Sequence, residues 1–585
     1  MRSAKALRGV LSKSRETAGL GPRSGSTSRL GSPRPLHSTP PGPAALALPQ
    51  DEVGRRRGGG VGGGGGTTAR KPRAVRDLPG PGFASNLVEF FWKDGFSRIH
   101  EIQLQQAHRF GAMWGTSFGP QFVVSLASPG LVAHVLRSEG PAPQRANMAS
   151  WREYRALRGR ANGLISTEGE EWLRMRAVLR QPLMRARSVW RHSEQINAIV
   201  EDVVSRVRCD RDERDGTVRN VNGLLFKFAM EGMASVLFER RLGCLAPEVP
   251  ADTRDYIAAL QLMFSMFKTT MYAGAIPHWL RPVLPGPWED FCRSWDGLFR
   301  FSEIHVDARA RELEEERATG GAARGQAGFL TEQLTSGALS RQELYANVTE
   351  MLLAGVDTTS FTMSWCLDLL ARHPLTQEAV LREVRERGPS GGWAPSAEHV
   401  AEMPLLRGVL KETLRLYPVL PGNGRVTQTD MVLGGHHIPK GTQLAMCHYS
   451  TSHDPATFPQ PESFRPERWL RDGASRGGPA GPHGDGSGEG EEEEGEEEEE
   501  AAHRCPESAH ESWHSQGFAS IPFGYGVRSC IGRRVAELEI HLALARLLLE
   551  FRLEVLPGAP RVPAKTHGLL GPGGSIDLRF VDRRS

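Results

Sequence analysis

The sequence predicts a mainly α-helical fold with small β-sheets, of the α+β class. Apolar residues recur at helical spacing in five segments, at Ile99–Phe110, Leu131–Ser138, Glu170–Val178, Tyr345–Ala371 and Leu405–Leu416. Short β-rich runs occur at Gln121–Leu126, Met431–Ile438 and Gln443–Met446, so we expect the sheets to draw on both ends of the folded sequence. The chain has 585 residues, 39% of them hydrophobic, which is enough for one large core.

The N-terminal segment has the composition of a mitochondrial transit peptide. Its first fifty residues hold eight Lys or Arg and one acid, Glu16, and Leu7, Val10 and Leu11 alternate with basic residues. A basic disordered tail would show the same residues. No run of 18 apolar residues occurs there, which argues against an endoplasmic-reticulum anchor helix. We expect residues 1–77 to be a transit peptide and a Gly/Arg-rich linker, and residues 78–585 to be the catalytic domain.

A second tract inside that domain is predicted to stay solvated. Residues 471–515 are Gly/Pro-rich and then acidic, with ten glutamates between Glu489 and Glu500 that form a block of like charge. The seven cysteines are dispersed, with no Cys-x-x-Cys pair, as is typical of a reducing compartment. The net charge of +4 is small and argues against a nucleic-acid partner.

The loop from Phe523 to Gly532 is the strongest chemical signal in the chain. It surrounds Cys530 with Gly526, which can adopt positive φ, and with Arg528. A helix predicted from Arg533 to about Phe551 would direct its N-terminal amides at the cysteine and favour a thiolate. A cysteine in an ordinary Gly-rich turn is the simpler alternative. Four positions of this loop carry residue types that suit a metal-ligating thiolate, which argues against that alternative.

This loop resembles the haem-binding loop of the cytochromes P-450, and the resemblance runs from about Leu78 to the C-terminus. It implies the cytochrome P-450 fold, with haem b between the oxygen-binding helix and the helix after the cysteine. Cys530 would be the axial ligand of the iron. The other haem contacts that the resemblance implies are Trp172, Arg176, Arg425, Phe523, Gly526, Arg528 and Gly532.

A defect in the Tyr345–Ala371 helix is the second signal. Ala354-Gly355-Val356-Asp357-Thr358-Thr359 places a glycine and two threonines in a helix interior, at a cost in stability. Thr358 can bond back to a carbonyl one turn earlier, open the helix and offer its hydroxyl to a ligand. Alone, this would be a tolerated irregularity. Beside the Cys530 loop, the resemblance implies that Asp357 and Thr358 deliver protons to dioxygen.

Three further groups of residues follow from the resemblance. Glu412, Arg415 and Arg468 match a buried structural charge triad. Arg407, Lys411, Arg533 and Arg534 match a docking site for an acidic ferredoxin, although a solvated basic face would look the same. The apolar and aromatic stretch from Leu262 to Leu280 is core or the roof of a lipophilic pocket that touches a membrane. The pocket residues expected are Phe264, Phe267, Met271, Ala354, Val419 and Leu420.

Within the mitochondrial cytochromes P-450 the chain looks most like family 27. Met263–Pro277, Cys292–Asp307 and Lys565–Gly574 are similar to its subfamily C, the all-trans-retinol 3,4-desaturases. This implies oxidation of all-trans-retinol to 3,4-didehydroretinol, with 3- or 4-hydroxylated side products. Electrons would come from NADPH through ferredoxin reductase and a [2Fe–2S] ferredoxin. The implied location is the matrix side of the inner mitochondrial membrane, as a peripheral protein.

Two alternatives remain at this point. The substrate could be a vitamin D compound or a sterol side chain, as in sister subfamilies. A haem-thiolate isomerase, lyase or sensor that uses no dioxygen would need neither Asp357-Thr358 nor a ferredoxin site, so Thr358→Ala would leave its activity intact.

Overall fold

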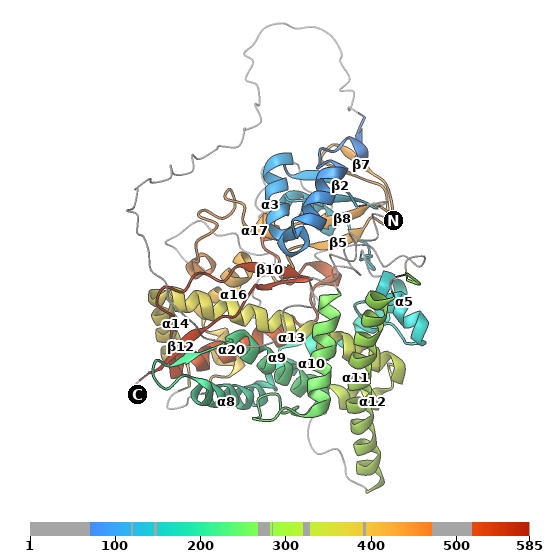
Figure 1. Cartoon of the computed structure of the whole chain (residues 1–585). Coiled ribbons are helices and arrows are strands. Elements are labelled where there is room, and N and C mark those ends of the chain that lie inside the picture. Colours follow the sequence, from blue (N-terminus) through green and yellow to red (C-terminus); the bar gives the residue numbers. More distant parts are fainter. Residues whose placement is uncertain are drawn as a thin grey trace, which may run out of the picture. The chain divides into compact units, whose positions relative to one another are not determined.

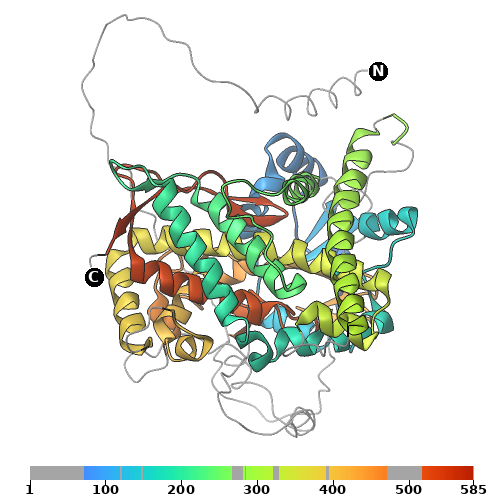
Figure 2. The same ribbon diagram turned by 90° about the horizontal axis from the view of Figure 1, so that it is seen from below.

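Helices from the middle of the chain form the body of the protein, and small sheets lie beside them (Figures 1 and 2). The computed structural model describes residues 71–118, 121–145, 149–266, 281–283, 285–319, 328–389, 394–470 and 517–583, with the side chains of residues 91 and 118 excepted. The expected transit peptide and linker up to residue 70, the acidic insert, Phe267 and Met271 lie outside these residues.

The helices account for most of the described chain. The α-helices are α2 (Phe83–Leu87), α3 (Ile99–Phe110), α4 (Pro129–Arg137), α5 (Ala149–Arg158), α6 (Gly169–Met184), α7 (Ala186–Trp190), α8 (Ser193–Asp210), α9 (Val221–Phe238), α10 (Ala251–Ser265), α11 (Gly286–Ala318), α12 (Phe329–Ser336), α13 (Arg341–Arg372), α14 (Pro374–Arg387), α15 (Ala397–Ala401), α16 (Pro404–Leu416), α17 (His448–Ser452) and α20 (Arg533–Glu550). The shorter helical turns are η1 (Val75–Asp77), η2 (Val88–Trp92), η3 (Gly95–Arg98), η6 (Pro466–Trp469), η8 (Gly517–Ala519) and η9 (Gly526–Arg528).

Twelve short strands in the described residues form four small sheets. The strands are β1 (Arg73–Ala74), β2 (Met113–Phe118), β3 (Gln121–Leu126), β4 (Thr217–Val218), β5 (Asn423–Val426), β6 (Met431–Leu433), β7 (His436–Ile438), β8 (Gln443–Met446), β9 (Phe551–Val555), β10 (Ala564–His567), β11 (Leu569–Pro572) and β12 (Leu578–Asp582). Their orders are β1-β7-β6, β2-β3-β8-β5, β4-β12-β9 and β10-β11. The predicted fold class is confirmed, including sheets drawn from both ends of the chain.

The four-stranded sheet fixes the position of Arg425. β3 pairs with β8 in parallel, with Val124 opposite Leu444, and β5 pairs with β8 in the antiparallel sense, with Arg425 opposite Leu444. Residues more than 300 positions apart thus share one sheet. The β1-β7-β6 sheet extends the folded unit to the N-terminal side of the expected boundary at residue 78, because Arg73 already pairs with His436.

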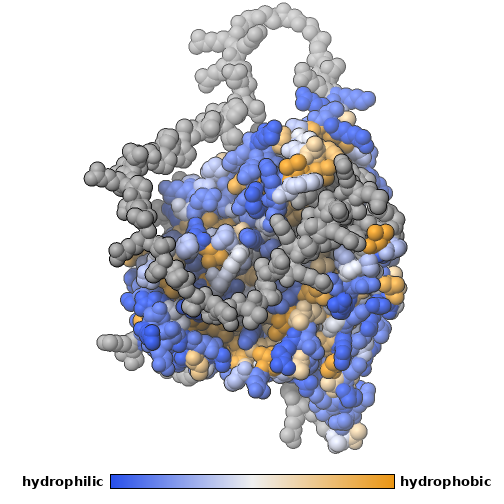
Figure 3. Space-filling view, viewed as in Figure 1, coloured by the Kyte–Doolittle hydropathy of each residue, from blue (hydrophilic) through white to orange (hydrophobic). Residues whose placement is uncertain are grey.

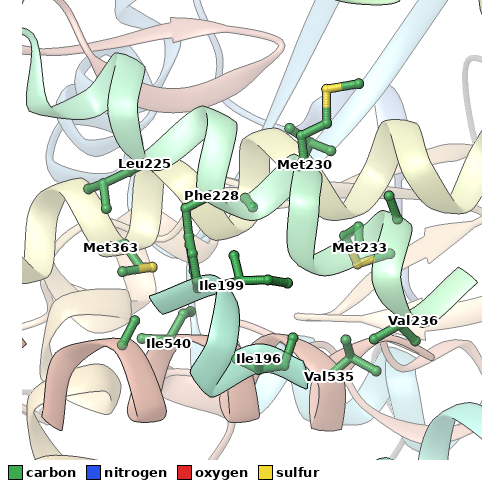
Figure 4. Close-up of a cluster of buried hydrophobic side chains, with 14 of the residues drawn as sticks. Ile196, Ile199, Leu225, Phe228, Met230, Met233, Val236, Met363, Val535 and Ile540 are labelled. Atoms are coloured by element: carbon green, nitrogen blue, oxygen red, sulfur yellow. The ribbon is translucent and has the colours of Figure 1, made fainter. Parts of the chain in front are cut away.

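The core lies between α8, α9, α13 and α20 (Figure 4). α9 packs closely along α13, and the glycine in the α13 defect explains how. A Cβ placed on Gly355 would lie 2.5 Å from the sulfur of Met233, so glycine allows the two helices to approach. Within the described residues, α9 is the one helix long and apolar enough to span a membrane, and 72% of it is buried inside the protein. It is therefore a core helix.

The face seen in Figure 3 is largely hydrophilic, with apolar side chains in small scattered patches. Apolar side chains instead fill the interior, where Trp114, Trp172, Trp295 and Trp365 are almost fully buried. Burial of this kind is the main source of stability for a domain of this size.

Candidate functional site

The loop before α20 holds Cys530 at the position the sequence predicts. The Cys530 amide donates to the Phe523 carbonyl oxygen over 2.8 Å, and the Ser529 amide donates to that of Gly526 over 3.0 Å. Gly526 has φ of 65°, which favours glycine and agrees with the expectation. Gly532 has an ordinary φ of −86° and precedes α20 directly, so its backbone alone does not require glycine.

The Cys530 side chain is accessible, although it lies deep among protein atoms. This combination is typical of a side chain that faces the interior of a protein rather than its outer surface. Burial raises the pKa of the Cys530 thiol, while a hydrogen bond from the Gly532 amide and the charges of Arg176 and Arg145 oppose the rise. The surroundings thus supply the donor and the cations that an ionised sulfur needs.

Three predicted arginines converge on this loop. Arg176 of α6 donates from Nη2 to the Ser529 carbonyl oxygen over 2.8 Å. The guanidinium carbon of Arg528 lies 3.8 Å from the centroid of the Trp172 ring, and its Nε donates to the Pro143 carbonyl oxygen over 3.0 Å. Arg425 of β5 is buried and donates to the carboxylate of Glu139.

A fourth guanidinium, that of Arg145, belongs to the same group. Burial lowers its pKa to about 10, and repulsion from Arg425 and Arg176 contributes. Burial also lowers the pKa of Arg528 to about 9, with repulsion from Arg145, Arg425 and Arg176. Like charges are costly to enclose unless anions accompany them. Four neighbouring guanidiniums, two of them buried and two half-buried close to a thiol, therefore fit a dianionic group that is ligated by sulfur, such as haem with its two propionates.

α13 presents one narrow accessible face in an otherwise buried helix. Ala354 is exposed and Thr358 and Phe361 are half-buried, at a spacing that places them on one side. The Thr358 hydroxyl donates to the Ala354 carbonyl oxygen over 2.6 Å, as predicted. The expected opening of the helix is wrong, because α13 remains α-helical through this bond. The hydroxyl oxygen thus stays on the accessible face of the helix.

Asp357 lies next to Thr358 but is almost fully buried. Its surroundings raise the pKa of its carboxyl to about 7, and desolvation is the cause. Burial raises the pKa of the phenol of Tyr256 on α10, a residue that the sequence did not single out, and the charge of Asp357 adds to the rise. The Tyr256 hydroxyl is buried with no hydrogen-bond partner among the described residues. A carboxyl with a pKa near neutrality can both take up and release a proton.

The predicted charge triad forms as expected. Arg415 donates from Nε and Nη2 to the two carboxylate oxygens of Glu412 over 2.9 and 2.8 Å, and both side chains are fully buried. Arg468 donates from Nε to the same carboxylate over 3.1 Å. The Trp469 indole and the Arg465 amide complete its hydrogen bonds. The triad joins α16 to η6, and its role is structural.

The four predicted docking residues come from two helices that pack together, α16 and α20. Arg407 and Lys411 are half-buried on α16, and both charges act on His541 of α20. Arg534 is exposed, whereas Arg533 pairs with Glu537 one turn later over 2.8 Å. The basic residues thus lie on neighbouring helices, and one of their charges is already compensated.

The predicted pocket residues within the described chain lie on three separate segments. Phe264 is half-buried near the end of α10, and Ala354 is on the accessible face of α13. Val419 is buried and its carbonyl oxygen accepts from the Leu570 amide of β11, while Leu420 is 45% exposed. Phe267 and Met271 cannot be placed, because they lie outside the described residues.

Comparison with known proteins gives a consistent result. Residues 78–580 match the family "Cytochrome P450". Cytochrome P450 27C1 of Danio rerio is 54% identical over 88% of this chain and 88% of its own length, and cytochrome P450 27C1 of Aquarana catesbeiana is also 54% identical, over 88% and 89%. The mitochondrial 25-hydroxyvitamin D-1 alpha hydroxylase of Homo sapiens is 43% identical over 87% of this chain and 93% of its own.

The fold also matches a solved structure. The cytochrome P450DA heme domain has a TM-score of 0.66 at 19% identity, over 88% of this chain and 98% of that one.

Proposed function

The chain belongs to the cytochrome P450 family, as a monooxygenase of family 27 similar to subfamily C, and from this premise we propose that it oxidises all-trans-retinol to 3,4-didehydroretinol. The single observation that carries a haem-thiolate reaction is the arrangement of Cys530 near Arg145 and Arg176, which in turn adjoin the buried Arg425 and Arg528. When bound, haem b supplies the oxidation of an unactivated C–H bond with dioxygen and two electrons. The chain's own residues hold that group, supply protons and orient the substrate.

Cys530 would ligate the iron, and the loop holds it in place through the bond from its amide to Phe523. Arg145, Arg425 and Arg528 would bind the propionates. Arg176 already bonds the Ser529 carbonyl oxygen, so it would fix the loop as well as add positive charge. Trp172 lies under Arg528 and keeps that guanidinium in position.

Asp357 and Thr358 would deliver protons. The carboxyl of Asp357 is buried with a pKa of about 7, so at neutral pH it exchanges a proton readily. The Thr358 hydroxyl is on the accessible face of α13, one residue away, and can pass a proton to a bound molecule. Ala354 on the same face leaves room for that molecule.

Electrons would arrive from NADPH through ferredoxin reductase and a [2Fe–2S] ferredoxin. Arg407 and Lys411 of α16 and Arg533 and Arg534 of α20 offer cations to an acidic partner on the same side as Cys530. The mitochondrial relatives support a mitochondrial location. We place the protein on the matrix side of the inner membrane, in peripheral contact with it.

The substrate assignment depends on the similarity to subfamily C. Desaturation requires two hydrogens to leave neighbouring ring carbons, so the pocket must hold both C–H bonds close to the oxidant. Phe264, Ala354 and Val419 supply apolar surface for a retinoid ring. The 43% identity to a vitamin D hydroxylase favours a second candidate, a secosteroid that would be hydroxylated.

The test begins with the purified full-length chain. Its reduced, carbon monoxide-bound spectrum should show a thiolate-ligated haem, and Cys530→Ser should lose that signature. The reconstituted system is then given all-trans-retinol or 25-hydroxyvitamin D. Didehydroretinol as the main product supports the proposal. Hydroxylation of the secosteroid with little retinoid turnover would favour the second candidate instead.

A further inference from the structure

The segment from Glu139 to Arg145 lies along β5 and the Cys530 loop. The Val426 amide donates to the Gln144 carbonyl oxygen over 3.1 Å, and Gln428 donates from Nε2 to that of Ala142 over 2.9 Å. The Pro143 carbonyl oxygen accepts from Arg528. The 139–145 segment thus touches the strand of Arg425, bonds Arg528 directly and ends on Arg145.

Glu139 makes the one charged contact of this segment with β5. Its carboxylate accepts from Arg425 Nε over 2.5 Å, and the two side chains are only 10% and 8% exposed. Arg425 Nη1 is also used, by the Gly424 carbonyl oxygen. Among the described residues no hydrogen bond to Arg425 Nη2 is found, so the pair leaves that corner of the guanidinium for another acceptor.

The Glu139 carboxylate lies in a site proposed to bind the two haem propionates, so the presence of this negative charge has to be explained. Alone, Glu139 would repel a propionate that approaches Arg425, and burial costs both partners of the pair their hydration. Burial indeed raises the pKa of Glu139, against the attraction of Arg425 and Arg528. The stabilising effect of the Glu139 carboxylate on the site must therefore exceed its repulsion of the propionates.

The charges of the whole site supply that reason. Arg145, Arg176, Arg425 and Arg528 carry four positive charges. Two propionates and the Cys530 thiolate would supply three negative charges. Nearby Glu350 and Glu168 already pair with Arg155 and Arg152, so they are not available. Glu139 is a fourth anion, and it reduces the excess of positive charge in the enclosed site.

We propose that Glu139 is a cofactor-positioning residue, which fixes Arg425 by its Nε edge, directs Nη2 at a haem propionate and reduces the excess of positive charge in the site. This inference rests on the proposed haem-thiolate function. Removal of the Glu139 charge leaves Arg425 free to rotate and leaves one repulsive cation in the site. Haem should then be held less tightly, although the propionate itself would meet less negative charge.

The experiment measures haem transfer from the full-length, haem-loaded protein to excess apomyoglobin. Glu139→Gln keeps the size of the side chain and removes its charge, and we expect haem loss roughly tenfold faster than in the wild type. Glu139→Asp keeps the charge at a shorter reach and should fall between the two. In an Arg425→Gln background, Glu139→Gln should no longer speed haem loss, because its partner is gone and the unpaired carboxylate would only repel the propionates.

Two controls separate charge from packing. Gln428→Ala removes an uncharged hydrogen bond of the 139–145 segment, and Glu153→Gln removes the charge of a half-buried ion pair with Arg281 elsewhere. Both should lose haem at the wild-type rate. The proposal is overturned if Glu139→Gln loses haem at the wild-type rate or more slowly, or if Gln428→Ala has the same effect. Wild-type protein that binds no haem would instead contradict the proposed function itself.

Discussion

The Arg528 guanidinium lies over the Trp172 indole, with 3.8 Å between the guanidinium carbon and the ring centroid. Arg528 is also repelled by three other arginines, so without the ring it would turn towards water. The pair explains why a buried tryptophan in α6 belongs to a site centred on a loop more than 350 residues later. The Trp172 indole holds the Arg528 guanidinium in place against repulsion from the neighbouring arginines.

Trp172→Leu should therefore weaken haem binding more than it weakens the fold. A desolvated cation–π contact contributes about 2 kcal/mol, so we expect haem loss to rise by about an order of magnitude. The measurement is haem transfer to apomyoglobin together with the thermal midpoint of unfolding. Trp365→Leu, which removes an equally buried indole from α13, is the control. An equal effect of both variants on haem loss would contradict the prediction.

Thr358→Ala should separate oxygen consumption from product formation. The hydroxyl that passes protons is lost, so reducing equivalents should leave as hydrogen peroxide while product per NADPH falls several-fold. Thr362→Ala is a matched control, because Thr362 also bonds one turn back on α13, to the Thr358 carbonyl oxygen, but is buried. Peroxide and product are quantified together. Unchanged coupling in Thr358→Ala would favour a reaction without dioxygen.

Asp357 should make the protein less stable as pH rises towards neutrality. Its folded-state pKa of about 7 lies above the ordinary value of 3.8, so the folded state binds the proton more tightly than the unfolded state. The stability gained is fully present below the unfolded pKa and is lost as pH rises through the folded pKa. Asp357→Asn should remove about 2 kcal/mol of the fall in unfolding free energy between about pH 5 and about pH 7. Denaturant titrations at both pH values measure it, and parallel curves for the two proteins would contradict it.

The Glu412 triad should be needed for folding rather than for chemistry. Glu412→Ala leaves two guanidiniums, the Trp469 indole and a backbone amide without their acceptor, at a cost of roughly 3–5 kcal/mol. Glu412→Gln should cost less, because it keeps part of the hydrogen bonding. Chemical denaturation gives both values, and Glu402→Gln, on a mostly exposed side chain, should be neutral. A small loss in Glu412→Ala would be inconsistent with the buried geometry.

Lys411→Glu should weaken ferredoxin binding and flatten its dependence on salt. A charge reversal on α16 replaces attraction of an acidic partner by repulsion, and the effect should fade at high ionic strength. Arg385→Glu, on an exposed face of α14, is the control with the same change of charge. Titration of the haem spectrum with ferredoxin at several salt concentrations is the measurement. Equal weakening by both variants would indicate a general effect of net charge.

Local pattern was enough to predict some elements and not others. α3, β3 and β8 have the expected bounds, because each shows a clear apolar period and a defined end. α9 has no counterpart among the predicted helices, because apolar residues lie on almost all of its sides and leave no amphipathic period. Gly355 was read as a defect in α13, whereas it provides close packing against Met233.

The candidate site shows the same division. Cys530, Arg528 and the Glu412 triad stand in recognisable local motifs. Glu139 and Arg145 do not, because their roles depend on a partner strand: Glu139 and Arg425 are 286 residues apart. Tyr256 likewise becomes a candidate only because the buried carboxyl of Asp357, on another helix, acts on it. Contacts of this kind arise from tertiary packing, which the spacing of residues along a chain does not encode.

The parallel pairing of β3 with β8 has a consequence for the order in which the enzyme is assembled. The strand that bears Arg425 cannot reach its place until both a segment near residue 124 and one near residue 444 are available, and Cys530 is made later still. A partly synthesised or partly translocated chain therefore lacks a complete set of haem-binding residues. Insertion of haem must be among the last events of maturation, and truncation near the C-terminus should leave an empty polypeptide.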